Sequence, residues 1–263
     1  MTALPPVSLA GRVVLVTGAT QGMGEGIARA AAAAGAAGIC VAGRDAARAE
    51  AVAAGLRTAG TAAHAAVADL GDAEACRRIV AEAEAALGTV DALVNAAGLT
   101  DRGTIEDTPV ELWDRLFAVN ARAPFILTQE VVRRLKPSRR PGSIVNIITM
   151  SSHGGQPFLT AYAASKGALA TLTKNTAHAL RDARIRVNGI NIGWADTPGE
   201  HAIQARDGRP ADWLAAAEAA QPFGRLIRPA DVAGLAVYLL SDAAAMMTGA
   251  LIDFDQNVMG AYG

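Results

Sequence analysis

The chain has 263 residues, of which 51% are hydrophobic, and a net charge of −1. This length can bury a substantial core, and the near-zero charge gives no electrostatic basis for binding nucleic acid or an anionic membrane. No apolar run reaches the roughly 20 residues of a membrane span, and the first residues lack a signal-peptide pattern. Neither the cysteines, Cys40 and Cys76, nor the four histidines have metal-ligand spacing. We therefore expect a cytoplasmic protein without a metal site.

Short apolar runs alternate with Ala-rich stretches along the whole chain. Ala is the best helix former, so residues 24–35 and 72–87 are predicted helices. The apolar runs are continuous rather than alternating, which indicates strands buried on both faces. This order predicts βαβ units and a parallel sheet, in one α/β domain over residues 1–263. The predicted strands are 12–18, 38–43, 62–70, 91–98, 142–149, 185–193 and 250–256.

The first predicted strand leads directly into a glycine-rich loop. Gly18, Gly22 and Gly24 stand between this strand and the start of a helix. Glycines let the backbone turn tightly and approach a pyrophosphate closely, and the helix N-terminus supplies free N–H groups. The position of the loop in the first βα turn predicts a dinucleotide-binding site. A tight turn without a ligand is the alternative.

The loop spacing in TGATQGMG resembles that of the short-chain dehydrogenase/reductase family, in its short single-domain branch. Further pieces follow in that family's order over residues 10–256: ADL at 68–70, NAAG at 95–98, Asn120, Tyr162 with Lys166, and 222–242. The resemblance implies a Rossmann-type, doubly wound sheet of about seven parallel strands with helices on both faces. It also implies an NAD(P)-dependent oxidoreductase that moves a hydride between nicotinamide and a secondary alcohol or ketone. A homotetramer, or a homodimer, is the implied assembly, packed through residues 223–256.

The resemblance places the cofactor across the carboxyl ends of the strands. Asp69 and Leu70 would meet the adenine, and the NAAG segment would pass beneath the ribose and pyrophosphate. The implied cofactor-binding residues are Gly18, Thr20, Gln21, Gly22, Met23, Gly24, Arg44, Asp69, Leu70, Asn95, Ala96, Gly98, Tyr162, Lys166, Gly193, Trp194 and Thr197.

The end of the second predicted strand bears on the choice of cofactor. A carboxylate there would bind the ribose hydroxyls, whereas the planar fork of an arginine suits a 2′-phosphate. By the resemblance, Gly43 stands in the place of the discriminating acid, and Arg44 follows it. We therefore predict that NADP(H) is preferred over NAD(H). Two features oppose this: Asp45 could neutralise Arg44, and Gln21 occupies the second basic position.

Tyr162 and Lys166 are spaced i and i+4 in a helix-like segment, so both project from one face. A tyrosine with an ordinary pKa of about 10 is a poor acid–base group near neutrality. A nearby ammonium favours the phenolate, so Lys166 and the positive nicotinamide of the oxidised cofactor together are expected to lower the pKa of Tyr162. The resemblance implies that Tyr162 transfers the proton and Lys166 holds the nicotinamide ribose. It implies that Asn120, unfavourable inside a helix, supports a kink and a proton-relaying water.

The family's substrate-orienting serine lies thirteen residues before the tyrosine, and in this chain that position is Thr149. A threonine offers the same donor and acceptor as serine and can stabilise charge on a substrate oxygen. We predict that Thr149 takes this role, with Ser151 as the alternative if the register of the loop is shifted.

The specificity loop is predicted after Thr149 and in the irregular insertion at about 195–223, since long insertions are commonly functional. The candidate lining residues are polar and favour a sugar, polyol or small hydroxy-carbonyl compound. A 3-oxoacyl carrier-protein reductase and an inactive cofactor-sensing protein are the alternatives. The candidates are His153, Gly155, Gln156, Trp194, Glu200 and His201.

Overall fold

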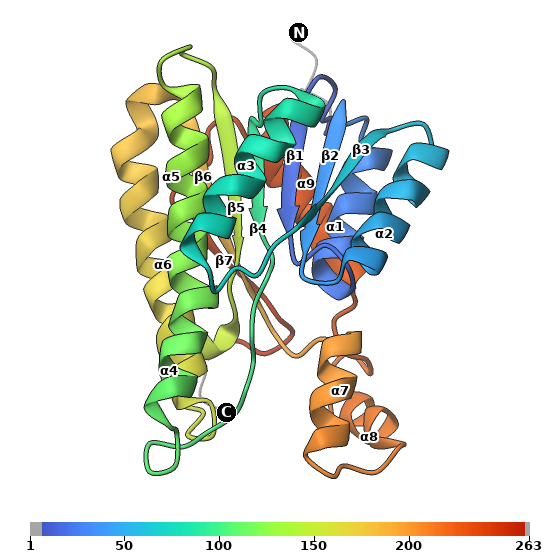
Figure 1. Cartoon of the computed structure of the whole chain (residues 1–263). Helices are drawn as coiled ribbons and strands as arrows, with labels where there is room; N and C mark the ends of the chain where they lie inside the picture. Colours follow the sequence, from blue (N-terminus) through green and yellow to red (C-terminus); the bar gives the residue numbers. More distant parts are fainter. Residues whose placement is uncertain (1–6, 261–263) are drawn as a thin grey trace, which may run out of the picture.

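A seven-stranded, entirely parallel sheet forms the centre of the molecule (Figure 1). The computed structural model describes residues 7–260; the outermost parts of the predicted domain, 1–6 and 261–263, lie outside the described residues. The strand order is β3-β2-β1-β4-β5-β6-β7, so the order reverses between β1 and β4. In doubly wound sheets a ligand crevice opens at such a switch point, beyond the carboxyl ends of the strands. The strands are β1 Val13–Thr17, β2 Gly38–Gly43, β3 Ala62–Val67, β4 Ala92–Asn95, β5 Gly142–Ile147, β6 Ile185–Ile192 and β7 Leu251–Phe254.

The structure confirms all seven predicted strands, and most of them end earlier than predicted. The strand predicted over 62–70 ends at Val67, and the one predicted over 91–98 ends at Asn95. The residues that follow are still apolar or small because they enter loops that are covered by other elements. An apolar run therefore marks burial rather than the last paired residue of a strand.

Helices cover both faces of the sheet and enclose two apolar cores. α1, α2 and α9 pack on one face through residues such as Ile27, Val52 and Val232. α3, α5 and α6 pack on the other, through Ile79 and Leu127 among others. The helices are α1 Gly22–Ala33, α2 Ala46–Thr58, α3 Ala73–Leu87, α4 Val110–Phe117, α5 Ala123–Leu135, α6 Thr160–Leu180, α7 Pro198–Arg206, α8 Trp213–Ala219 and α9 Pro229–Leu240.

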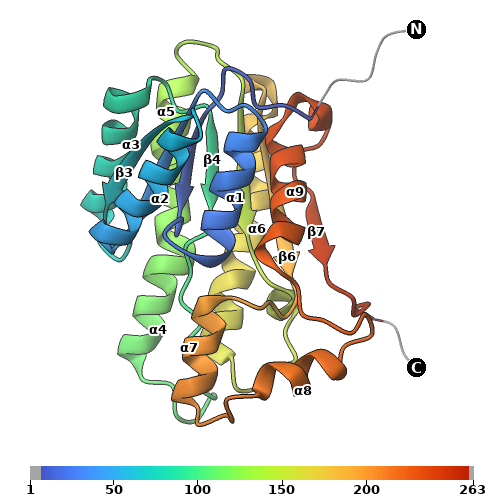
Figure 2. The same cartoon turned by 90° about the vertical axis from the view of Figure 1, so that its right-hand side faces the viewer.

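The irregular insertion folds into two short helices beyond the sheet. α7 and α8 lie past the carboxyl ends of the strands, opposite the lower half of α4 (Figure 2). The side chain of Thr197 caps α7 by accepting a hydrogen bond from the N–H of Glu200, and Pro198 opens the helix. The insertion therefore covers the edge of the sheet at which a doubly wound fold binds its ligand.

Three further observations concern ligands and membranes. Within residues 7–260, no helix is both long and apolar enough to cross a bilayer. Over the same range, no group of three or more His, Cys, Asp or Glu side chains could hold a metal ion. Cys40 and Cys76 are both free thiols and both buried.

Candidate active site

A cavity of about 1070 Å³ lies at the carboxyl ends of the strands, between the sheet and the α7–α8 insertion. It joins the glycine loop to the Tyr162–Lys166 pair, which are far apart in the sequence. Among the predicted cofactor residues, Asn95 alone is not in its wall, and among the predicted catalytic residues, Asn120 alone is not. The predicted residues that line it are Gly18, Thr20, Gln21, Gly22, Met23, Gly24, Arg44, Asp69, Leu70, Ala96, Gly98, Thr149, Tyr162, Lys166, Gly193, Trp194 and Thr197.

The glycine loop leaves no room for side chains at two of its positions. A Cβ on Gly24 would lie 2.3 Å from the carbonyl oxygen of Gly18, and a Cβ on Gly18, whose φ is +65°, would lie 2.7 Å from the Cα of Ala97. α1 then begins at Gly22 without a side-chain cap from Gln21, so its first N–H groups point toward the cavity side of the loop. Bare backbone and a helix start fit the pyrophosphate of a dinucleotide.

Cationic side chains gather where β2 ends. Arg44 lines the cavity, and Arg48 from α2 donates from Nη1 to Oε1 of Gln21 at 2.7 Å. Asp45 pairs with Arg48, at 3.2 Å, and caps α2 by accepting from the N–H of the same residue. Asp45 is thus engaged with Arg48 and the helix start. Arg44 lines the cavity at this end, and Arg48 is not in its wall but contacts Gln21, which is.

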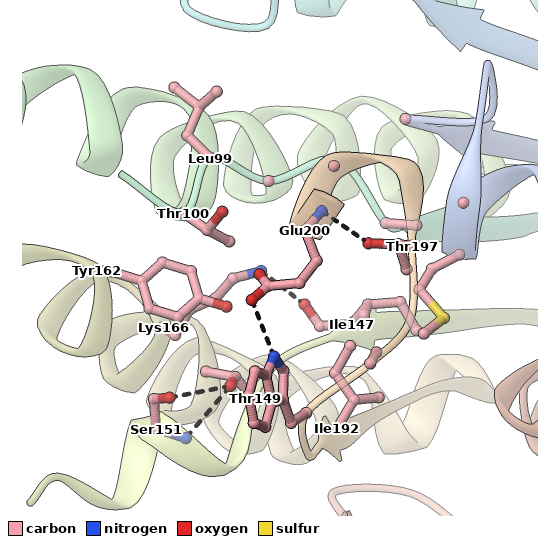
Figure 3. Close-up of a pocket in the computed structure, with 18 of the residues that line it drawn as sticks. Leu99, Thr100, Ile147, Thr149, Ser151, Tyr162, Lys166, Ile192, Thr197 and Glu200 are labelled. Atoms are coloured by element: carbon pink, nitrogen blue, oxygen red, sulfur yellow. Dashed lines mark hydrogen bonds between the residues drawn. The ribbon is translucent and has the colours of Figure 1, made fainter. Parts of the chain in front are cut away.

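Tyr162 and Lys166 lie side by side on α6 and are 8% and 4% exposed (Figure 3). Nζ of Lys166 donates to the carbonyl oxygen of Ile147 at 2.8 Å. Burial raises the pKa of Tyr162 to about 12, a hydrogen bond from Thr149 lowers it, and the charge of Glu200 raises it. Burial lowers the pKa of Lys166 to about 8. Burial has the largest effect at both groups, and Lys166 is not among the causes that shift the pKa of Tyr162. The lowering expected from Lys166 together with the oxidised nicotinamide stays a prediction.

Asn120 lies behind the cavity and joins three segments. It sits in a π-helical turn, Ala118–Arg122, between α4 and α5, where the sequence predicted a kinked helix. Its Oδ1 accepts from the N–H of Leu99 at 2.9 Å, and its Nδ2 donates to the carbonyl of Leu99 and to Oγ of Ser165, at 2.9 and 3.0 Å. Asn120 therefore holds the loop after β4 against the helix that carries Lys166.

Asn95 also lies outside the cavity wall. Its Nδ2 donates to Oδ1 of Asn146 at 2.8 Å, and Nδ2 of Asn146 donates to Oγ1 of Thr173. Oδ1 of Asn95 is buried without a hydrogen-bond partner among the described residues. This network ties β4 to β5 and α6 one layer below the cavity floor.

Both candidate hydroxyls line the cavity. Thr149 accepts from the N–H of Ser151 at 3.2 Å and caps the short 3-10 turn Met150–His153. The two hydroxyl oxygens are 3.3 Å apart, and Oγ of Ser151 donates to Oε1 of Gln156. Of the two hydroxyls, Thr149 is the one whose side chain lowers the pKa of Tyr162, which supports the role predicted from the spacing.

The insertion and the loop after Thr149 contribute fewer of the predicted substrate residues than expected. Gln156, Trp194 and Glu200 line the cavity, whereas His153, Gly155 and His201 do not. His153 points to Asp253, at 3.1 Å, because the turn ends at Gly154 and the chain leaves the cavity. His201 follows Glu200 on α7 and points to another side of the helix, toward Asp196 at 2.8 Å.

Several lining residues were not predicted from the sequence. Arg102, in the loop after β4, bonds Asp207 from Nη1 at 2.7 Å, and its guanidinium lies 5.7 Å from the ring centroid of Phe158. Trp213 stacks on Trp194 with centroids 5.9 Å apart. Trp213 lies within the predicted insertion, which was a usable signal, whereas no spacing or periodicity marked Arg102.

The fold, the glycine loop and the Tyr162–Lys166 pair together define the class of protein: an NAD(P)-dependent oxidoreductase. The chain belongs to the short-chain dehydrogenase/reductase family, as the resemblance predicted. The family model described as enoyl-(acyl carrier protein) reductase matches residues 18–256. Gluconate 5-dehydrogenase of Gluconobacter oxydans is 33% identical, over 95% of this chain and 96% of its own length.

Two other relatives extend the comparison. Galactitol 2-dehydrogenase of Agrobacterium fabrum is 35% identical, over 88% of this chain and 90% of its own. The crystal structure of a gluconate 5-dehydrogenase from Burkholderia cenocepacia, in complex with NADP and tartrate, superposes with a TM-score of 0.87 at 32% identity. That match covers 99% of this chain and all of the other, so it includes the α7–α8 insertion.

Proposed function

We propose that the chain is an NADP(H)-preferring dehydrogenase that interconverts a secondary alcohol and a ketone on a sugar, polyol or small hydroxy-carbonyl compound. One observation carries the proposal: a single cavity joins a pyrophosphate-type glycine loop to a hydroxyl, a tyrosine and a lysine. When bound, the nicotinamide supplies or accepts the hydride.

The residues of the cavity would divide the remaining work. Tyr162 transfers a proton at the substrate oxygen, and Thr149, which lines the cavity with it, holds that oxygen and stabilises its charge. Lys166 holds the nicotinamide ribose from the neighbouring turn of α6. Asn120 does not itself line the cavity, and we propose that it acts through Leu99 and Ser165 by keeping the ribose-binding loop and α6 together.

The preference for NADP(H) rests on the two arginines at the end of β2. Arg44 lines the cavity, and Arg48 lies against Gln21, the loop residue in the second basic position. Two guanidinium groups favour a 2′-phosphate over a free ribose hydroxyl. The relative from Burkholderia cenocepacia, crystallised with NADP, supports the same cofactor.

The substrate class rests on the polar side chains at the far end of the cavity, which stand beside apolar ones such as Phe158 and Trp213. Gln156, Glu200, Gln204 and Arg102 offer hydrogen-bond donors and acceptors to a polyhydroxylated molecule, where a long acyl chain would require an apolar wall. The named relatives act on gluconate and galactitol, which supports a sugar acid or polyol.

We further propose a single dinucleotide-binding domain with the 195–223 insertion as its substrate loop, in a cytoplasmic homotetramer or homodimer. The two buried free thiols, Cys40 and Cys76, fit a reducing compartment. Apolar side chains that are exposed in the single chain, among them Phe125 and Met246, fit an assembly of several copies.

A substrate screen tests the proposed function. The purified protein is incubated with sugars, polyols, sugar acids and 3-oxoacyl thioesters, in both directions and with both cofactors, and nicotinamide absorbance is followed. We expect turnover of a polyhydroxylated substrate, with a higher kcat/KM for the NADP(H) couple, and loss of turnover in Tyr162→Phe. NADPH binding without turnover of any compound would instead identify an inactive cofactor-sensing protein.

A further inference from the structure

Glu200 places a carboxylate inside the candidate active site. It lies in the first turn of α7, lines the cavity, and has a side chain that is 16% exposed. Figure 3 shows it pointing from the insertion toward Tyr162 and Lys166. The Thr197 cap accepts from its N–H at 3.1 Å, which fixes its backbone at the helix start.

The polar partners of Glu200 converge on one of its two oxygens. Oε1 accepts from Nε1 of Trp194 at 2.9 Å and from Nε2 of Gln204 at 2.6 Å. Nη2 of Arg102 is 3.6 Å from the same atom. A carboxylate has about four acceptor sites, and the described part of the chain supplies no hydrogen bond to Oε2. The side chain is thus oriented through Oε1, and Oε2 remains available to a ligand in the cavity.

The charge of Glu200 opposes the chemistry of its neighbour. It raises the pKa of Tyr162, which makes the phenolate harder to form. The charged groups that face Glu200 are Arg102 from the loop after β4, which it shares with Asp207, and Lys166 on α6. This carboxylate is held in place by Trp194, Gln204 and Arg102 although it makes the catalytic phenolate harder to form. A role in binding the substrate would account for its position.

We propose that Glu200 is a specificity-determining residue, whose Oε2 accepts a hydrogen bond from a substrate hydroxyl on the carbon next to the reacting one. This inference rests on the proposed function and narrows its substrate class. Polyols and sugars that carry a neighbouring hydroxyl would be favoured over simple secondary alcohols. A substrate carboxylate next to the reacting carbon would be repelled by Glu200, so a sugar acid would react at a carbon farther from its carboxylate.

The test compares butane-2,3-diol with butan-2-ol as substrates, which share a carbon skeleton and differ by one hydroxyl. We expect the unmodified enzyme to show a kcat/KM about 10- to 100-fold higher for the diol, the range for a hydrogen bond to a charged group. Glu200→Ala should reduce this ratio to near one, because activity on the diol should fall relative to activity on butan-2-ol.

A second readout distinguishes binding from mere folding. Glu200→Gln keeps the acceptor for Trp194 and removes the charge, so it should lower the pKa of Tyr162. The acid limb of the pH profile for alcohol oxidation should then move to lower pH. Glu218→Gln is the matched control, because Glu218 lies on α8 of the same insertion and is not in the cavity wall; it should move neither the ratio nor the profile.

The outcomes separate the two proposals. If the unmodified enzyme turns over neither alcohol, nor any compound of the wider panel, the proposed function fails and the inference fails with it. If it turns over secondary alcohols and Glu200→Ala leaves the diol ratio unchanged, the proposed function stands and the role of Glu200 is wrong. An unchanged ratio in a folded Glu200→Gln, together with an unmoved pH profile, would contradict the role of Glu200 without depending on the alanine variant.

Discussion

At Thr149 a single methyl group separates this site from the serine of the family pattern. Thr149 lines the cavity, lowers the pKa of Tyr162, and accepts a hydrogen bond from the N–H of Ser151. If it stabilises charge on the substrate oxygen, Thr149→Val should lower kcat by about 10²-fold or more, the usual loss for an oxyanion-type donor. Thr149→Ser should keep most of kcat. Steady-state kinetics on the best substrate of the panel checks both.

Ser151→Ala is the control for that prediction. The Ser151 hydroxyl donates to Gln156, so its loss should affect KM more than kcat. A nearly unchanged kcat in Thr149→Val, together with a collapse of kcat in Ser151→Ala, would transfer the orienting role to Ser151.

Lys166 carries a buried charge, which lowers the free energy of unfolding of the protein. Burial lowers its pKa from 10.5 to about 8, so at pH 7 the folded state holds an ammonium that water would solvate better. The shift corresponds to at most about 3 kcal/mol. A substitution that removes the charge would recover this free energy, less the contribution of the lost hydrogen bond to Ile147. Lys166→Met should therefore raise the free energy of unfolding by about 1–3 kcal/mol at pH 7, measured by urea denaturation, while abolishing turnover.

The pH dependence of the Lys166→Met effect follows from the sign of the pKa shift. Between pH 8 and 10.5 the unfolded chain keeps the Lys166 proton that the folded chain has lost. The unfolded state then binds more protons, so this contribution to stability rises with pH. The difference in the free energy of unfolding between Lys166→Met and the unmodified protein should be constant below pH 8 and shrink above it. An advantage that grows above this pH would contradict the shift.

At the scale of elements, the α4–α5 junction depends on one side chain. Asn120 is fully buried in the π-helical turn and makes three hydrogen bonds to Leu99 and Ser165. Asn120→Ala removes these three hydrogen bonds and leaves the N–H and carbonyl of the partly buried Leu99 without this partner, which should lower the free energy of unfolding by about 2 kcal/mol or more. Chemical denaturation measures this. Asn257→Ala, at an exposed position, should change the free energy by less than about 0.5 kcal/mol.

The same elements show what the sequence could and could not predict. Strands and long helices were predicted well, because runs such as residues 13–16 are apolar throughout and are buried on both faces of the sheet. The π-helical turn was anticipated only as a kink at Asn120, since its hydrogen bonds reach Leu99 and Ser165, which lie 21 and 45 residues away. The structure of 195–223 was not predicted, because α7 has no amphipathic repeat and is fixed by its cap and by ion pairs to the loop after β4.

The candidate site also contains residues that the sequence could locate and residues that it could not. Residues attached to strand ends or to α6, such as Gly18 and Tyr162, could be located from motif spacing because the sheet brings strand ends together. Arg102 could not, because it reaches the cavity through contacts with Asp207 and Phe158 that no local pattern records. His201 was wrongly predicted because its neighbour Glu200 lines the cavity and one step along a helix redirects a side chain. His153, also wrongly predicted, pairs with Asp253 instead.

At the scale of the whole molecule, apolar side chains are exposed on two separate sides. Val110, Trp113 and Phe125 lie on α4 and α5, and Met246 lies just before β7. Figure 2 shows α4 and α5 on one side of the molecule and β7 on the other. A tetramer with three two-fold axes needs at least two different self-complementary surfaces on each chain. Two apolar sides are the minimum from which the proposed homotetramer could assemble.

This arrangement predicts how the assembly should come apart. The chain has a mass of 26.8 kDa, and light scattering on the purified protein should give four times that value. Phe125→Glu and Met246→Glu each place a charge in one of the two apolar sides, where desolvating it would be unfavourable. Each variant alone should give dimers, and the double variant should give monomers that still bind NADPH. A monomeric unmodified protein would refute the homo-oligomer, and tetramers that survive both substitutions would place the interfaces elsewhere on the surface.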